Sequence, residues 1–304
     1  MAAAKKGSSP QKRPLVPPGL AKTVGWLVGP GRTMSLMVLV AVAFGGGWYL
    51  IWQAVGPGVL SSEDYRLTAD AVEITPVPEW IHKQDKDICR EVFRDASLDG
   101  GRVSINDPGL AERIRSAFAL NPWVATVKSV QKYHPARVKV DLVYRRPVCV
   151  VEIGDQRYPV DSEGVLLPSE DLSTTEAARY PRLVRIDREL GMLVGRRWND
   201  PRVAGAAEIA DAFGPAWEKL GLELIVPLYA AGTDRVRDCS YELVTRGGTR
   251  ILWGRAPNGA FPGESSPAEK VGRLQEYHKE HGTLEGTSGA QQLDLTRAGS
   301  IQRR

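Results

Sequence analysis

The chain has 304 residues, a formal net charge of +4 and 42% hydrophobic residues. This length favours two small domains over one large core. The three cysteines are an odd number, which excludes a framework in which every thiol is paired. Their spacing does not resemble that of zinc ligands, so no zinc site is expected; they are Cys89, Cys149 and Cys239.

Residues 1–33 are basic and rich in proline. The first acidic residue of the chain is Glu63, while Lys5, Lys6 and Arg13 are among the basic residues before it. Such a composition cannot form a packed core and predicts a disordered tail. A basic tail can bind nucleic acid or anionic lipid. We favour a topogenic signal, which predicts a cytoplasmic tail and no nucleic-acid partner.

Residues 34–55 contain no charged side chain and predict a transmembrane helix. A helix of this length reaches about 33 Å, enough for a bilayer core. Trp48, Tyr49 and Trp52 lie near its outer end, where aromatic rings prefer the headgroup layer. A cleavable signal peptide would have a shorter apolar region. We therefore expect a single-pass anchor in the cytoplasmic membrane, with the N-terminus cytoplasmic, a linker at 56–66 and the remainder extracytoplasmic.

Residues 67–146 predict a small α/β module. The expected order is strand, helix, helix, strand, strand, which describes a small sheet with helices on one side. Asp107-Pro108 is typical of a helix start, and the last strand alternates apolar and polar side chains. The predicted elements are a strand around Val72 and Ile74, a helix at 81–94, a helix from Asp107 to about Asn121, a strand from Val124 to Val130 and a strand at 137–144.

Residues 147–304 predict a mixed β-sheet domain with flanking helices, so the expected fold class is α+β. Ser266-Pro267-Ala268-Glu269 is a capping box and predicts a helix with Val271, Leu274 and Tyr277 on one face. Gly247-Gly248 predicts a hairpin turn. The other predicted elements are a helix from Asp200-Pro201 to Phe213 and strands at 222–227, 241–245, 250–253, 292–296 and 300–302.

The first module resembles the POTRA domain of the FtsQ/DivIB family of bacterial cell-division proteins. In that family a helix ends in Pro-Trp-Val, a basic strand and an aromatic-x-Pro turn follow, and the next strand ends in Arg-x-Pro-Val. The corresponding residues here are Pro122-Trp123-Val124, Val127-Lys128-Ser129-Val130, Tyr133-His134-Pro135 and Arg145-Arg146-Pro147-Val148. We expect Trp123 to pack the sheet.

The resemblance continues into the second domain and shows departures. Val160-Asp161-Ser162-Glu163-Gly164 resembles the family's V-D-x-x-G, and Trp253-Gly254-Arg255 followed by a helix and Asp294-Leu295-Thr296 resembles the end of its β domain. His134 replaces the usual Trp, Arg145 stands where Glu is common, and Thr296 replaces Arg. These departures concern partner contacts more than the fold.

The resemblance implies a scaffold of the division machinery that acts in septum formation at the division site and binds a membrane pair resembling FtsB and FtsL. In the family, binding uses the terminal edge strand of the β domain and a neighbouring helix, because an edge strand can accept a partner strand. The first module's basic strands could form a further partner surface or a solvated face; their residues are Lys128, Lys132, Arg137 and Lys139. The candidate partner-binding residues of the second domain are Ser300, Ile301, Gln302, Arg303, Arg273 and Tyr277.

No catalytic, cofactor or metal site is expected from the motifs. Ser288 does not lie in a Gly-x-Ser-x-Gly elbow, and no phosphate-binding loop occurs. His278 and His281 have a spacing that can bind metal, but no third ligand is evident. We therefore expect no enzyme, no cofactor and no small-molecule substrate. The alternative is a membrane-anchored periplasmic enzyme or cell-wall-binding protein; a POTRA-type secretion component is disfavoured because no transmembrane β-barrel segment follows.

Overall fold

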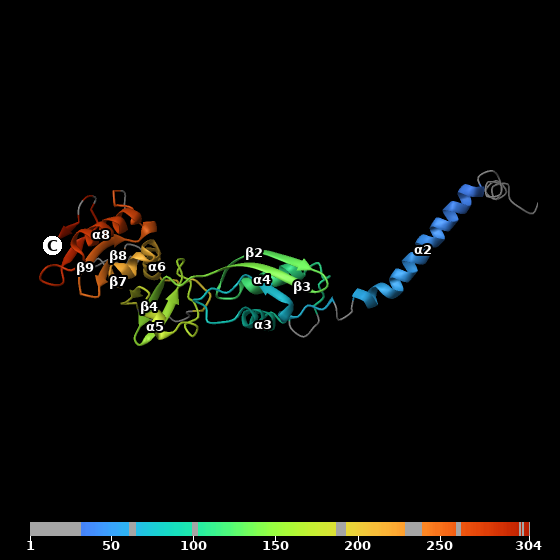
Figure 1. The fold of residues 1–304 in the computed structure, drawn as a ribbon, viewed down its shortest axis with the longest axis horizontal. Helices are drawn as coiled ribbons and strands as arrows, with labels where there is room; N and C mark the ends of the chain where they lie inside the picture. The colour runs from blue at the N-terminus through green and yellow to red at the C-terminus, as the bar shows by residue number, and fades with distance from the viewer. Residues whose placement is uncertain are drawn as a thin grey trace, which may run out of the picture. The chain divides into compact units, whose positions relative to one another are not determined.

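The computed structural model describes residues 32–60, 65–98, 103–186, 193–228, 239–259, 263–297, 299 and 301–303. The chain divides into two compact units, Met1–Glu63 and Asp64–Arg304. The described residues form a mixed α+β protein with one apolar N-terminal helix and two mixed sheets (Figure 1). This confirms the predicted fold class at that level.

The first unit contains α2, which spans Arg32–Leu60. Its stretch Met34–Gly56 has a mean hydropathy of 1.9, and among the described residues it is the one helix long and apolar enough to cross a membrane. Its large apolar side chains from Met34 to Val55 are exposed on the protein, as expected for a helix whose apolar surface faces lipid. The predicted apolar helix is confirmed as one that is long and apolar enough to span a membrane, and it continues to Leu60, into the predicted linker.

The second unit begins with a three-stranded sheet of order β1-β3-β2. Strand β1 is parallel to β3, and β2 is antiparallel to β3. The predicted order of strand, helix, helix, strand, strand is confirmed. The elements are η2 (Ala69–Ala71), β1 (Val72–Ile74), α3 (Asp85–Asp95), α4 (Leu110–Ala119), β2 (Val124–Tyr133) and β3 (Arg137–Tyr144).

One face of this sheet packs against the helices and forms the first core. Successive side chains of a strand point to opposite faces, and Val138, Val140 and Leu142 of β3 are buried while their neighbours face outward. Ile114 and Phe118 of α4 are fully buried in the same hydrophobic cluster. We call the residues from 65 to 146 the first module.

Both helices of the first module begin later than the sequence predicts. Helix α3 begins at Asp85 instead of Ile81, because the backbone of Gln84, its N-cap residue, is extended. Asp85 then places a carboxylate in the first turn, where the helix dipole favours negative charge. Helix α4 begins at Leu110: the Asp107 carboxylate accepts a hydrogen bond from the Gly109 N–H at 2.8 Å and so caps the turn that precedes the helix.

The second module, from residue 147 onward, is built on an eight-stranded sheet of order β11-β10-β9-β8-β7-β6-β4-β5. The pairs β4–β6, β6–β7 and β9–β10 are parallel, and the others are antiparallel. The elements are β4 (Cys149–Ile153), β5 (Gln156–Val160), α5 (Thr174–Ala177), β6 (Arg182–Leu183), α6 (Pro201–Phe213), α7 (Ala216–Lys219), β7 (Leu222–Leu228), β8 (Ser240–Thr245), β9 (Arg250–Arg255), η4 (Pro257–Gly259), α8 (Pro267–His281), β10 (Gln292–Asp294) and β11 (Gln302–Arg303).

Most predicted elements of the second module are confirmed. Asp200 caps α6, and the capping box of Ser266 and Glu269 opens α8 with both reciprocal hydrogen bonds formed. The strands β7, β8 and β9 agree with the prediction to within a few residues. The last strand differs: β11 comprises Gln302–Arg303 rather than residues 300–302. Strands β4, β5 and β6 are not foreseen by the sequence analysis.

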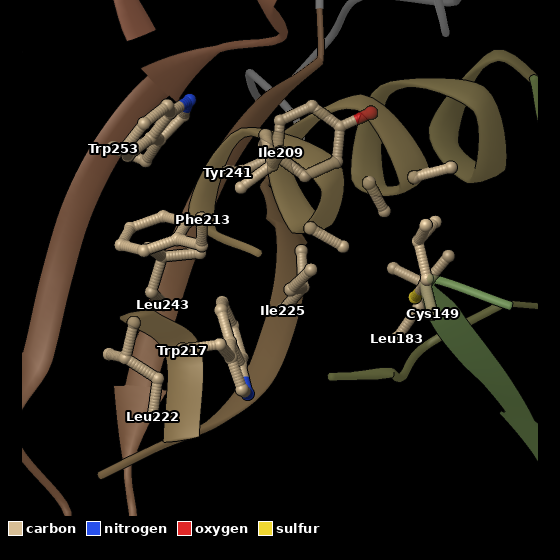
Figure 2. Packing of buried hydrophobic residues seen from close by; sticks show 14 of the residues in the cluster. Cys149, Leu183, Ile209, Phe213, Trp217, Leu222, Ile225, Tyr241, Leu243 and Trp253 are labelled. Atoms are coloured by element: carbon tan, nitrogen blue, oxygen red, sulfur yellow. The ribbon is translucent and has the colours of Figure 1, made fainter. Parts of the chain in front are cut away.

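Aromatic side chains dominate the second core. In Figure 2, Phe213 of α6 lies between Trp253 of β9 and Trp217 of α7, with ring centroids 5.3 and 5.4 Å from theirs. Tyr241 of β8 lies against α6 at Gly205, where a Cβ atom would come within 2.2 Å of the Tyr241 hydroxyl. A glycine is therefore needed at this point for the helix to rest on the sheet.

Candidate functional site

The terminal edge of the eight-stranded sheet is the candidate site. Strand β10 lies between β9, to which it is parallel, and β11, to which it is antiparallel. Leu293 pairs with Arg303, and Asp294 pairs with Gln302. Two of the predicted site residues, Gln302 and Arg303, therefore form the outermost strand of this sheet, and the Gln302 side chain is exposed.

The two preceding candidates have different positions. Ile301 is partly buried and packs against the second core, so it anchors the start of strand β11 to that core. Ser300 lies outside the described residues. The structure thus places one side of this short segment on the core, and the exposed side chain that it presents is that of Gln302.

Arg273 holds the segment that leads into β11. Its Nη1 donates hydrogen bonds to the carbonyl oxygens of Arg297 and Gly299 at 2.7 and 3.0 Å, and its Nη2 donates to that of Leu295 at 3.0 Å. The planar guanidinium suits this arrangement because it presents several donors in a fixed geometry. A partner contact of Arg273 stays a prediction, and its described contacts position the segment that leads into the edge strand.

Tyr277 also has a supporting position. It is only 8% exposed, its hydroxyl accepts a hydrogen bond from Gln291 Nε2 at 2.9 Å, and its ring stacks on His281 with centroids 4.2 Å apart. His281 Nδ1 lies 2.9 Å from the Tyr277 carbonyl oxygen. Within the described ranges, no group of three or more His, Cys, Asp or Glu side chains is arranged to hold a metal ion.

Beneath this edge, a buried ion pair fixes α8 to the sheet. Lys270 is 2% exposed, and its Nζ donates to the Trp253 carbonyl oxygen at 2.8 Å and to Glu264 Oε1 at 2.5 Å. The ammonium also lies 4.8 Å from the centroid of the Trp253 ring. A buried charge is tolerated only when it is paired and hydrogen-bonded, and these contacts meet that need. Neither Lys270 nor Glu264 was singled out from the sequence.

The opposite edge of the same sheet is covered. Strand β5 is its last strand, and the Pro159 carbonyl oxygen accepts a hydrogen bond from the Leu167 N–H at 2.8 Å. Val160 forms a further bridge with Leu166. Proline also lacks an N–H that a partner strand could use. The two edges therefore differ. The edge at β5 is covered by a later segment of the chain, whereas the other edge is the short strand β11.

The Pro-Trp-Val motif lies where the two modules meet. The Trp123 side chain is buried in the first core, and its indole N–H donates to Asp171 Oδ2 at 2.8 Å. Lys83 Nζ lies 3.6 Å from the same carboxylate oxygen. Leu167, although it follows the predicted domain boundary, is fully buried in the first core. Trp123 therefore packs the sheet as predicted and also bonds to the second module.

Arg145 forms an ion pair with Asp161, the aspartate of the Val-Asp-x-x-Gly motif. Its Nη1 donates to Asp161 Oδ2 at 2.5 Å and lies 3.3 Å from Glu163 Oε2. Asp161 Oδ1 also accepts the backbone N–H groups of Glu163 and Val165. The Arg145 guanidinium is thus matched by a carboxylate of the adjoining segment.

An open cavity of about 410 Å³ lies at the same junction. Trp80, Tyr180 and Trp217 supply aromatic surface, and Arg146 and Asp211 form an ion pair at 3.0 Å in its wall. Its lining contains charged side chains and aromatic rings, and the lining residues that the structure describes include no serine, cysteine or histidine.

The cysteines are chemically protected. All three are free and buried. Burial raises the pKa of Cys89 and Cys149 to about 12, and the carboxylates of Asp85 and Asp70 add to the effect at Cys89. Burial also raises the pKa of Cys239. Because the thiolate is the reactive form, these side chains are poor nucleophiles and metal ligands in the folded protein.

Comparison with family models gives no match for this chain, and comparison with curated proteins gives none either.

Proposed function

We propose that this protein is a non-enzymatic, single-pass membrane scaffold of the bacterial division machinery, of the FtsQ/DivIB type. The motifs that resemble the POTRA domain and the β domain of that family support this proposal. A helix suited to crossing a membrane precedes two modules, which is the order of parts in such a scaffold. The basic residues before the helix favour a cytoplasmic N-terminus and an extracytoplasmic remainder.

The observation that carries the proposal is the asymmetry of the eight-stranded sheet. One edge is covered by residues 165–167, whereas the other ends in the two-residue strand β11, positioned by Arg273. An edge strand has backbone N–H and C=O groups that a partner strand can pair with, and β-strand addition is a common mode of recognition. We propose that a membrane partner resembling FtsB, together with FtsL, binds along β11.

The division role is tested in the cell. The full chain is fused to a fluorescent protein, and its distribution is recorded in dividing cells together with the effect of depletion. We expect a band at midcell and filamentous cells after depletion. A uniform membrane distribution, with normal division on depletion, would refute the division role.

The binding edge is tested by recovering partners from solubilised membranes with the full chain as bait. Deletion of residues 301–304 removes β11 and should abolish recovery of the membrane partner. As a control, Asp155→Asn alters an exposed turn beside β5 and should leave recovery unchanged. Undiminished recovery by the truncated chain, with unfolding temperature preserved, would show that β11 is not the binding edge.

A further inference from the structure

The hairpin formed by β2 and β3 ends in an exposed tip that is both aromatic and basic. Residues 131–135 are all exposed, and the Tyr133 side chain retains 45% of its surface. Arg137 and Lys139 follow on the sheet face opposite the helices, and both are exposed. This combination, a tyrosine with neighbouring cations, is typical of surfaces that contact lipid headgroups.

The tip lies beside the start of the second unit. The ring of Tyr65, the first described residue of that unit, meets the His134 ring edge-to-face at 6.1 Å. The Tyr65 carbonyl oxygen accepts a hydrogen bond from the Ile105 N–H, and the Leu67 N–H donates to Val103. These contacts keep the first residues of the unit next to the hairpin turn.

Chain length then limits how far the tip can be from a membrane that holds the apolar span. That span ends at Gly56, and α2 continues to Leu60. Four helical steps and five extended ones reach at most about 24 Å between Gly56 and Tyr65. Electrostatic attraction extends only about 8 Å at physiological ionic strength. The covalent connection therefore makes encounters between the tip and the membrane surface frequent. The side chains of the tip decide whether it stays in contact with that surface.

The local charge favours an anionic surface. Arg137 and Lys139 have no described carboxylate within ion-pair distance, and Lys132 donates to the Asp107 carbonyl oxygen, which leaves its positive charge uncompensated. Two acidic residues share the face: Glu73, which is beside Lys139 in the register, and Asp141, which accepts from the Ser129 hydroxyl. The cations are nearer the turn, so the tip itself is basic.

We propose that the β2–β3 tip binds the anionic headgroups of the bilayer in which α2 is anchored. Tyr133 lies in the headgroup layer, and Arg137 and Lys139 contact lipid phosphates. This contact orients the first module at the membrane surface. The proposal depends on the membrane anchor but not on the division role, and a bilayer without any other protein is enough to test it.

The test uses the full chain in nanodiscs. Because the three native thiols are buried, a single cysteine placed by Gln131→Cys is labelled with a fluorophore, and Asp155→Cys provides a control position on the β4–β5 turn. Quenching by lipids that carry a nitroxide on the headgroup is compared in phosphatidylcholine and in phosphatidylcholine mixed with phosphatidylglycerol. We expect strong quenching at position 131 in the anionic nanodiscs only, and weak quenching at position 155.

Charge substitution supplies the second arm. Each basic residue near an anionic surface contributes about fivefold, so Arg137→Gln with Lys139→Gln should lower the ratio of bound to unbound tip about 25-fold. The matched control, Arg179→Gln with Arg246→Gln, removes the same charge from exposed positions of the second module and should have no effect.

Three results would overturn the proposal. Equal quenching at positions 131 and 155 would show that the tip has no preferred contact with lipid. Quenching at 131 that is the same in both lipid mixtures, or that survives the double substitution, would show that the tether alone brings the tip close. Thermal unfolding of each variant confirms that the fold is retained, as expected for exposed side chains.

Discussion

Replacing Arg273 with alanine should release the terminal edge of the sheet without unfolding the module. The guanidinium donates three hydrogen bonds to carbonyl oxygens between Leu295 and Gly299, and this segment leads directly into β11. Arg297 and Gly299 are exposed, so water can replace the donors lost to their carbonyl groups, whereas Leu295 stays held in the core. The loss should therefore be local, affecting the equilibrium between the attached and detached segment.

The size of the effect follows from these three bonds. If each contributes about 1 kcal/mol net, Arg273 stabilises the attached segment by about 3 kcal/mol, which corresponds to about 150-fold in that equilibrium. Amide hydrogen exchange measured by NMR reports such local opening directly. Protection of the amides that pair β10 with β11 should fall by about two orders of magnitude in Arg273→Ala, while Leu243 in β8 and Ile251 in β9 keep their protection.

Arg273→Lys is the matched control. Lysine retains the charge but has one compact ammonium in place of the planar fork, so it can satisfy only part of the carbonyl set. We expect intermediate protection. Unchanged protection at β11 in the alanine variant would refute the positioning role, and an equal loss across β8 and β9 would show that Arg273 supports the whole module instead.

Three further predictions concern the core and the junction. Trp123→Phe removes the donor to Asp171 and should lower the free energy of unfolding by about 1.5–3 kcal/mol in urea titrations, since the acceptor is charged. Lys270→Met breaks the buried ion pair with Glu264 and should lower the free energy of unfolding by about 3–5 kcal/mol in the same assay. Cys89, with a pKa raised to about 12, should resist thiol reagents at pH 8 until the protein unfolds. As pH rises above about 8.5, the unfolded chain loses a proton that the folded protein retains, so stability should fall there and not below.

Local patterns predict the elements whose stabilising contacts are close in the sequence. Strand β3 has the predicted bounds, Arg137–Tyr144, because strict alternation places one face on the helices. Helix α8 begins at Pro267 because the capping box is formed by four consecutive residues. Strand β4 was missed because Val148–Val151 is a continuous apolar run, which does not distinguish a buried strand from a helix.

The candidate site could be predicted only in part, for a physical reason. The short terminal strand is suggested by its sequence pattern, and Gln302 and Arg303 do lie in it. The role of Arg273 depends on carbonyl groups 22–26 residues away, and no local pattern reports them. The same holds for Trp123 and its acceptor Asp171, which are 48 residues apart.

The burial of Leu167 in the first core has a consequence for how the chain can be divided in experiments. A fragment that stops at residue 146, where the sequence motifs suggest a boundary, would lack both this leucine and the acceptor of the Trp123 indole. Such a fragment would have an unfilled core and an unsatisfied buried donor, each of which is costly. Interaction mapping with it would mistake unfolding for loss of binding, so a fragment of the first module should extend at least to Asp171.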